Sequence, residues 1–121
     1  MKVLCICLRG NVRSVTAAYM LKEFCDIEAV AIGYTASSFT LRRKLITWAD
    51  HVLLLDSTAI NRVRGEFTHP TELAKMIDCK LSFAQSGIGF VFKPDLTEPL
   101  KEKFTQLGWW TPGKHKPFTG D

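Results

Sequence analysis

The chain has 121 residues, of which 46% are hydrophobic, and its 16 Lys and Arg against 12 Asp and Glu give a formal net charge of +4. This length and apolar content predict one globular domain over residues 1–121. No stretch approaches the roughly 20 apolar residues that span a bilayer. The apolar run Val3–Leu8 is too short for the core of a signal peptide. We therefore expect a cytoplasmic protein without a membrane partner.

The cysteines and histidines show no pattern of a metal site. The four cysteines are Cys5, Cys7, Cys25 and Cys79, and the three histidines are His51, His69 and His115. They lack the paired spacings of a zinc site, and the cysteines lack the density of a secreted disulfide scaffold. We therefore expect no metal and no cofactor. The positive charge favours anionic partners, but nucleic acid is also an anion, so charge alone does not identify the partner.

The first part of the chain alternates strands with helices. Val3–Leu8 is a continuous apolar run, which is typical of a central parallel strand covered on both faces. From Ser14 onward, apolar residues recur at three- and four-residue spacing, and this periodicity predicts a helix that ends near Cys25. A second strand is predicted over Glu28–Ile32 and stops at Gly33.

A second helix is predicted after that strand. Ser37 or Ser38 can cap its amino end. The expected buried stripe of this helix consists of Leu41, Leu45, Trp48 and Ala49. Arg42, Arg43 and Lys44 are then expected to face solvent.

A third strand and a third helix follow. His51–Leu55 is a buried strand by its apolar run, and Asp56–Ser57 can cap a short helix over Thr58–Arg64. Such alternation of strands and helices predicts an α/β fold, in which a parallel sheet of four strands lies between two layers of helices.

The pattern is weaker in the second half of the chain. Thr71–Met76 is weakly helical, and Lys80–Phe83 or Phe90–Lys93 is the predicted fourth strand. A last helix is predicted over Glu98–Leu107. The segment from Gly108 onward is rich in Gly and Pro, so we expect it to be irregular.

The segment between the first strand and the first helix has the composition of an anion site. Cys7 and Arg13 are separated by five residues and lie on either side of the predicted loop. A helix N-terminus offers unsatisfied N–H groups and a positive dipole end, and a short loop that curls into it aims several amides at one point. Such a nest binds a tetrahedral dianion. The residues expected to line it are Leu8, Arg9, Gly10, Asn11 and Val12.

Each residue type in this loop has a chemical role. Cys7 lies at the base of the nest, where the amides and the helix dipole favour the nucleophilic thiolate. Arg13 can return its planar guanidinium to two oxygens of the anion. Ser14 can donate its hydroxyl to the Cys7 sulfur. Gly10 and Asn11 tolerate the left-handed backbone that inward-pointing N–H groups require.

Cys7–Ser14 resembles the C-x5-R-S signature of the low-molecular-weight protein tyrosine phosphatases, which also follows an N-terminal apolar strand. Trp48–Asp56 resembles that family's Ala-Asp before an apolar strand ending in an acid, and Ala31–Thr35 loosely resembles its Ser-Ala-Gly-Thr segment. The similarity covers the first half of the chain well and the second half poorly. It implies the family's loop, placed between the first strand and the first helix.

The loop departs from the usual family pattern at two points. That family carries Gly-Asn at the second and third positions after the cysteine, whereas here Arg9 takes the second position and Gly10 and Asn11 come one place later. Val12 replaces its second loop cysteine. An arginine at the second position is similar to a compact bacterial and phage branch of predicted tyrosine phosphatases. These departures bear on substrate preference more than on the chemistry.

The resemblance implies a phosphomonoester hydrolase, with phosphotyrosine in a protein as the expected substrate and a phosphocysteine intermediate on Cys7. A small phosphomonoester is the other expected substrate class. Phosphate and vanadate should inhibit, and no nucleic acid partner is expected. The family's general acid is an Asp beside a Pro after the last strand, and here this residue is Asp95, next to Pro94. Glu98, beside Pro99, is the alternative.

Two other functions remain open at this point. Arsenate reduction uses the same loop but needs further cysteines for a relay disulfide, and only Cys79 lies in the later half of the chain. A non-catalytic phosphate-binding module would keep the nest without acid catalysis. For the other cysteines, Cys5, Cys25 and Cys79, we expect core packing. Trp109, Trp110 and Phe118 either line a substrate site, form an interface or cover the edge of the core.

Overall fold

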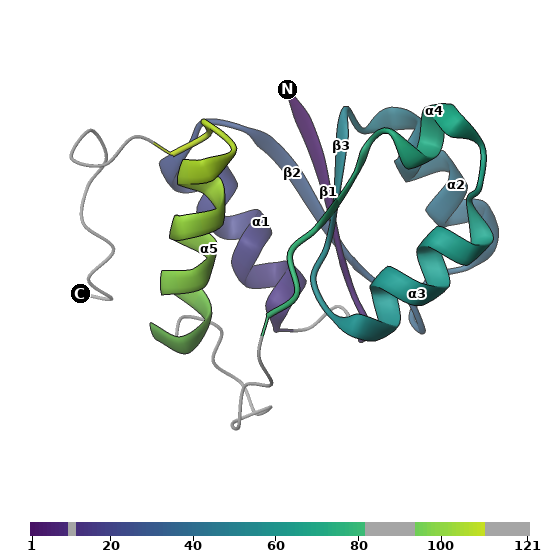
Figure 1. Cartoon of the computed structure of the whole chain (residues 1–121), viewed down its shortest axis with the longest axis horizontal. Helices are drawn as coiled ribbons and strands as arrows, with labels where there is room; N and C mark the ends of the chain where they lie inside the picture. The colour runs from purple at the N-terminus through teal and green to yellow at the C-terminus, as the bar shows by residue number, and fades with distance from the viewer. Residues whose placement is uncertain (10–11, 82–93, 111–121) are drawn as a thin grey trace.

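Four parallel strands form one sheet in the order β2-β1-β3-β4. The strands of this computed structural model are β1 (Lys2–Cys7), β2 (Glu28–Gly33), β3 (His51–Leu54) and β4 (Met76–Asp78) (Figure 1). The structure describes residues 1–9, 12–81 and 94–110, without the side chains at positions 94 and 95. β1 pairs with β2 along its whole length and with β3 on its other side. The predicted four-stranded parallel sheet is confirmed.

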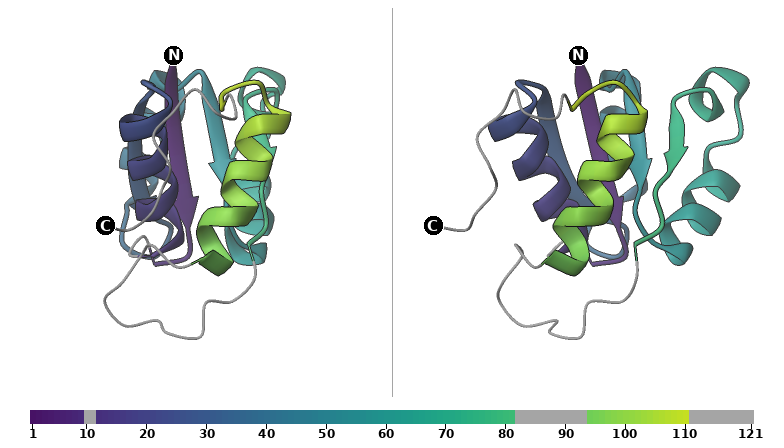
Figure 2. Two further views of the ribbon diagram at one scale, coloured as in Figure 1. Left: turned by 90° about the vertical axis from the view of Figure 1, so that its left-hand side faces the viewer. Right: turned by 60° about the vertical axis from the view of Figure 1, so that its left-hand side comes forward.

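Helices cover both faces of this sheet. They are α1 (Arg13–Phe24), α2 (Phe39–Trp48), α3 (Ser57–Glu66), α4 (Pro70–Leu73) and α5 (Pro94–Gln106). Figures 1 and 2 show α1 and α5 on one face, and α2 and α3 on the other. This arrangement confirms the predicted layers. Among the helices that the structure describes, none is long and apolar enough to cross a membrane.

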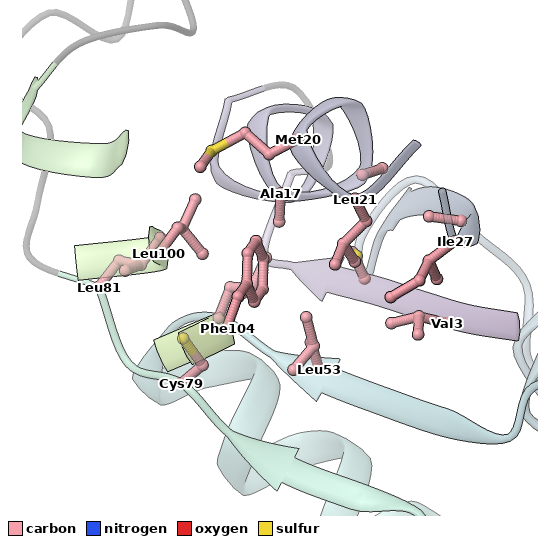
Figure 3. Close-up of a cluster of buried hydrophobic side chains, with 14 of the residues drawn as sticks. Val3, Ala17, Met20, Leu21, Ile27, Leu53, Cys79, Leu81, Leu100 and Phe104 are labelled. Carbon is pink, nitrogen blue, oxygen red and sulfur yellow. The ribbon is translucent and has the colours of Figure 1, made fainter. Parts of the chain in front are cut away.

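The face beneath α1 and α5 carries the larger of two buried hydrophobic clusters. Fully buried side chains from both helices and the sheet meet there, including Ala17, Leu21, Leu53, Leu100 and Phe104 (Figure 3). Cys5 and Cys7 belong to this cluster, because alternate residues of a strand share a face. Cys79 is buried in it and Cys25 packs at its edge, which agrees with the packing expected of Cys5, Cys25 and Cys79.

The order of the strands places a switch in chain direction at β1. After β1 the chain passes through α1 to β2 on one side, and α2 then carries it back to β3 on the other side of β1. Figure 2 shows that β1 and β3 point toward the same end of the molecule, as expected of parallel strands. In open α/β sheets, ligands bind at the carboxyl ends of the strands beside such a switch. The fold therefore favours a ligand site at the residues that follow Cys7, the last residue of β1.

The fourth strand of the described sheet lies at a position that the sequence did not predict. β4 is Met76–Asp78, and the sequence pattern placed the first of these residues at the end of the weak helix Thr71–Met76. Of the alternatives, Lys80 and Leu81 are not in a strand, and residues 82–83 and 90–93 lie outside the described residues. Among the residues that the structure describes, β4 pairs with β3 alone, and Met76 is the buried residue of this strand. Such a short edge strand has no hydrophobic periodicity to detect.

The last helix begins earlier than the sequence pattern indicated. α5 starts at Pro94, whereas the pattern predicted Glu98. Proline is favoured in the first turn of a helix and disfavoured in its interior, so Pro99 made a start near Glu98 the natural interpretation. Pro99 instead lies inside α5. Asp95 is consequently in the first turn of the helix rather than in a preceding loop.

The buried face of α2 differs from the predicted one. Arg42 is only 6% exposed, whereas Leu41 is 43% exposed. The buried guanidinium of Arg42 pairs with Glu66 of α3, with 2.8 Å between Nε and Oε1. Hydrophobic periodicity assigns arginine to the surface, because the pattern contains no information about a partner on another helix. Arg43 and Lys44 are exposed as predicted.

Candidate active site

The loop after β1 begins at the carboxyl edge of the sheet. Cys7 is the last residue of β1 and is 3% exposed, and Arg13 is the first residue of α1. Val12, at the N-cap, has no side-chain acceptor for the first amides of α1, and the first turn of α1 contains no acidic residue. The positive end of the helix dipole therefore faces the loop without a neutralising group from its own helix. This arrangement favours an anion.

Ser14 lies directly against the nucleophile candidate. The Cys7 Sγ–H donates to Ser14 Oγ at 3.2 Å, and Ser14 is fully buried. The two side chains come from the end of β1 and the first turn of α1. When Cys7 is a thiolate, the Ser14 hydroxyl becomes the donor of the pair. The structure thus shows the contact that the sequence predicted between these residues.

Asp56 joins three parts of the site, and it was not among the predicted site residues. Its Oδ2 accepts the Leu8 N–H at 2.7 Å and lies 3.8 Å from Arg13 Nη1. Its Oδ1 accepts the Ala59 N–H at 2.7 Å, which confirms Asp56 as the N-cap of α3. The carboxylate therefore holds the residue after Cys7, the guanidinium of Arg13 and the start of α3.

A signal for Asp56 was present in the sequence. Leu55 continues β3 alongside β1, since its N–H donates to Ile6 O at 2.9 Å, and Asp56 comes directly after it. An acid that follows a buried strand next to β1 must emerge at the same edge as Cys7. The Leu8 amide, one of those expected to bind an anion, has this carboxylate as its acceptor within the protein.

The loop after β2 completes the site from the other side. The Tyr34 N–H donates to Cys7 O at 2.8 Å, and the Thr35 N–H donates to Leu8 O at 2.9 Å. The Thr35 hydroxyl also donates to Leu8 O, at 3.0 Å. The ends of three neighbouring strands thus contribute to the position of the loop that follows Cys7.

The remaining predicted residues differ in what the structure shows of them. Arg9 is exposed and Val12 is half-buried against the core, while Gly10 and Asn11 lie outside the described residues. The side chain of Asp95 also lies outside them. Glu98 is exposed and its carboxylate is 3.6 Å from Lys101 Nζ. Figures 1 and 2 place the amino end of α5 at the same end of the molecule as the carboxyl end of β1.

The other three cysteines lie in the hydrophobic cluster beneath α1 and α5 or at its edge. Burial raises the pKa of the Cys25 thiol and that of the Cys79 thiol, each to about 11. Burial also raises the pKa of the Cys5 thiol, and the neighbouring Cys79 and Cys7 thiols add to this effect. These three thiols therefore stay protonated at neutral pH. Within the described ranges, no group of three or more His, Cys, Asp or Glu residues is placed to hold a metal ion.

Two solved structures share this fold. A YwlE arginine phosphatase from Geobacillus stearothermophilus is 22% identical, with 88% of each chain covered and a TM-score of 0.51. A YwlE mutant from Bacillus subtilis is 15% identical, with 89% of this chain and 99% of that chain covered and a TM-score of 0.56. No protein-family model matches the sequence, and neither does any curated protein. The chain shares the fold of these two structures, and its parallel sheet between two layers of helices is the fold that the sequence predicted.

We predict that Asp56→Ala destabilises the protein more than Ser38→Ala does. Ser38 caps α2 through one bond, with Leu41 N–H at 3.1 Å, and the loss of such a cap costs about 0.5–2 kcal/mol. Asp56→Ala removes a similar cap and also leaves the Leu8 N–H without its acceptor, which adds about 1–3 kcal/mol. Urea denaturation of the two variants measures the difference. Equal losses would show that Asp56 acts only as a helix cap.

Proposed function

We propose that the chain hydrolyses phosphomonoesters, with Cys7 as the nucleophile. The observation that carries this proposal is the buried contact of 3.2 Å between Cys7 Sγ and Ser14 Oγ at the amino end of α1. Arg13 stands at the start of the same helix, with Asp56 beside its guanidinium. The fold shared with a solved phosphatase supports the proposal.

In the first step the Cys7 thiolate attacks phosphorus in line with the leaving group. The S–P bond forms, the bond from phosphorus to the leaving oxygen breaks, and that oxygen takes a proton from a general acid. Arg13 binds two of the equatorial oxygens, where negative charge is spread in the transition state. The ion pair with Asp56 keeps the guanidinium directed toward the loop.

In the second step a water molecule attacks phosphorus of the phosphocysteine. The new P–O bond forms as the S–P bond breaks, and the proton of the water passes to the carboxylate left by the first step. Cys7 leaves as a thiolate, and the Ser14 hydroxyl donates to it as the charge returns to sulfur. Inorganic phosphate is released and the enzyme is restored.

The proposed substrate is phosphotyrosine in a protein, as the sequence resemblance implies. A second candidate follows from the solved structure of similar fold, which is described as an arginine phosphatase. With that substrate the bond that breaks is P–N rather than P–O, and the same nucleophile and anion site apply. Parallel assays of phosphotyrosine and phosphoarginine peptides distinguish the two substrates.

Two further functions compete with hydrolysis. Arsenate reduction on the same loop would need a second cysteine as a nucleophile, but burial raises the pKa of the Cys79 thiol to about 11, which disfavours its thiolate. A phosphate-binding module would keep the anion site without turnover. The measurement of both anion binding and turnover separates this module from an enzyme.

We predict that phosphate and vanadate raise the melting temperature of the wild type, because an anion that binds the native state stabilises it. Arg13→Ala should abolish this shift, whereas Arg43→Ala, a change of the same charge at an exposed position of α2, should preserve it. A shift retained in Arg13→Ala would place the anion elsewhere, for example at Arg43 and Lys44.

Cys7→Ser should abolish turnover of p-nitrophenyl phosphate.

The general acid is predicted to be Asp95, and its removal should affect a poor leaving group most. Asp95→Asn should slow phosphotyrosine hydrolysis by about 10²- to 10⁴-fold and p-nitrophenyl phosphate hydrolysis far less, because nitrophenolate needs little protonation. Glu98→Gln is the matched variant on the same helix. A selective loss in Glu98→Gln would transfer the role to Glu98. No selective loss in either variant would favour the binding module.

A further inference from the structure

The loop between β2 and α2 controls the orientation of two peptide groups beside the nucleophile. The Cys7 carbonyl accepts from Tyr34 N–H, and the Leu8 carbonyl accepts from both the N–H and the hydroxyl of Thr35. In a trans peptide, the N–H points opposite to the carbonyl. The bond at Leu8 O therefore also sets the direction of the Arg9 N–H, an amide expected to bind the anion.

The side chain of Arg42, on α2, donates hydrogen bonds to residues at both ends of this loop. Its Nη1 donates to Tyr34 O at 3.1 Å, to Ser37 O, and to Ser37 Oγ at 3.3 Å. The Ser37 hydroxyl in turn donates to Gly33 O at 2.6 Å. One buried guanidinium therefore holds both ends of the loop at residues 34–37.

Glu66 of α3 fixes the guanidinium and the side chain of Tyr34 together. Arg42 Nε donates to Glu66 Oε1 at 2.8 Å, and Nη2 donates to Oε2 at 3.0 Å. The Tyr34 hydroxyl donates to the same Oε2 at 3.1 Å, and the guanidinium carbon lies 4.1 Å from the centre of the Tyr34 ring. Bidentate pairs of this kind fix geometry as well as charge.

We propose that Tyr34, Arg42 and Glu66 are positioning residues for the proposed phosphatase site. They hold the loop at residues 34–37 so that its two amides orient the Cys7 and Leu8 carbonyls and, through the second of these peptides, the anion-binding Arg9 N–H. This inference rests on the proposed function, because the three residues act on catalysis only through the peptides that they orient at the phosphatase site. It applies equally to phosphate binding and to turnover.

A second ion pair on α3 provides a matched control. Arg64 Nε lies 3.0 Å from Asp78 Oδ1 on β4, and both side chains are more exposed than the Arg42–Glu66 pair. Glu66→Gln and Asp78→Asn each remove one carboxylate that pairs with an arginine of the same domain. Loss of a negative charge alone strengthens the binding of an anion. A weakening in Glu66→Gln therefore has the opposite sign to the general electrostatic effect.

The experiment measures the Kd of vanadate and the kcat and KM for p-nitrophenyl phosphate, well below the melting temperature of each variant. Glu66→Gln should raise the vanadate Kd and lower kcat/KM by about tenfold, because small misplacements at a reacting centre are costly. Asp78→Asn should leave both unchanged or slightly improved. Tyr34→Phe, which removes only the hydroxyl, should change both in the same direction as Glu66→Gln by a smaller factor.

Two results would overturn this inference, and they are distinguishable. Vanadate binding and turnover that match the wild type in both Glu66→Gln and Tyr34→Phe would reject the positioning role and leave the proposed function intact. A wild type that neither binds vanadate nor turns over p-nitrophenyl phosphate would reject the proposed function, and the positioning role would fall with it. If Glu66→Gln does not fold, Tyr34→Phe alone decides between the first result and the expected one.

Discussion

The Asp56 carboxylate is the constraint on which the rest of the site depends. It lies where the carboxyl ends of β1 and β3 meet, and its two oxygens hold the Leu8 N–H and the Ala59 N–H, each at 2.7 Å. The oxygen that holds Leu8 is also 3.8 Å from Arg13 Nη1. A single side chain thereby ties the loop after Cys7, the start of α1 and the start of α3. The parallel order of the strands makes this possible, because it brings all three segments to one edge of the sheet.

The loop after Cys7 is held from two opposite sides. Asp56 holds the Leu8 amide from the α3 side, and Tyr34 and Thr35 hold the Cys7 and Leu8 carbonyls from the β2 side. The orientation of these peptides thus depends on neighbouring elements as well as on the residues of the loop.

The sequence predicted the parts of the molecule that local patterns determine. The continuous apolar run of β1, the helical spacing of α1 and the caps at Ser38 and Asp56 are local signals, and the structure agrees with each. The anion-binding role of residues 8–12 comes from the same kind of local signal and stays a prediction. The misses depend on contacts between distant segments. Arg42 is buried in a pair with Glu66, which is 24 positions further along the sequence. Asp56 reaches the site because β3 lies beside β1 in the sheet.

The proposed mechanism requires a covalent phosphocysteine at Cys7, which a direct trapping measurement tests. The wild type is mixed with p-nitrophenyl phosphate and denatured rapidly during turnover, and its peptides are then analysed by mass spectrometry. We predict one phosphoryl group on the peptide that carries Cys5 and Cys7, which fragmentation places on Cys7. We predict none on Cys5, Cys25 or Cys79, whose thiol pKa values burial raises. Turnover with the phosphoryl group on another residue, or with none on Cys7 at any time, would contradict the account.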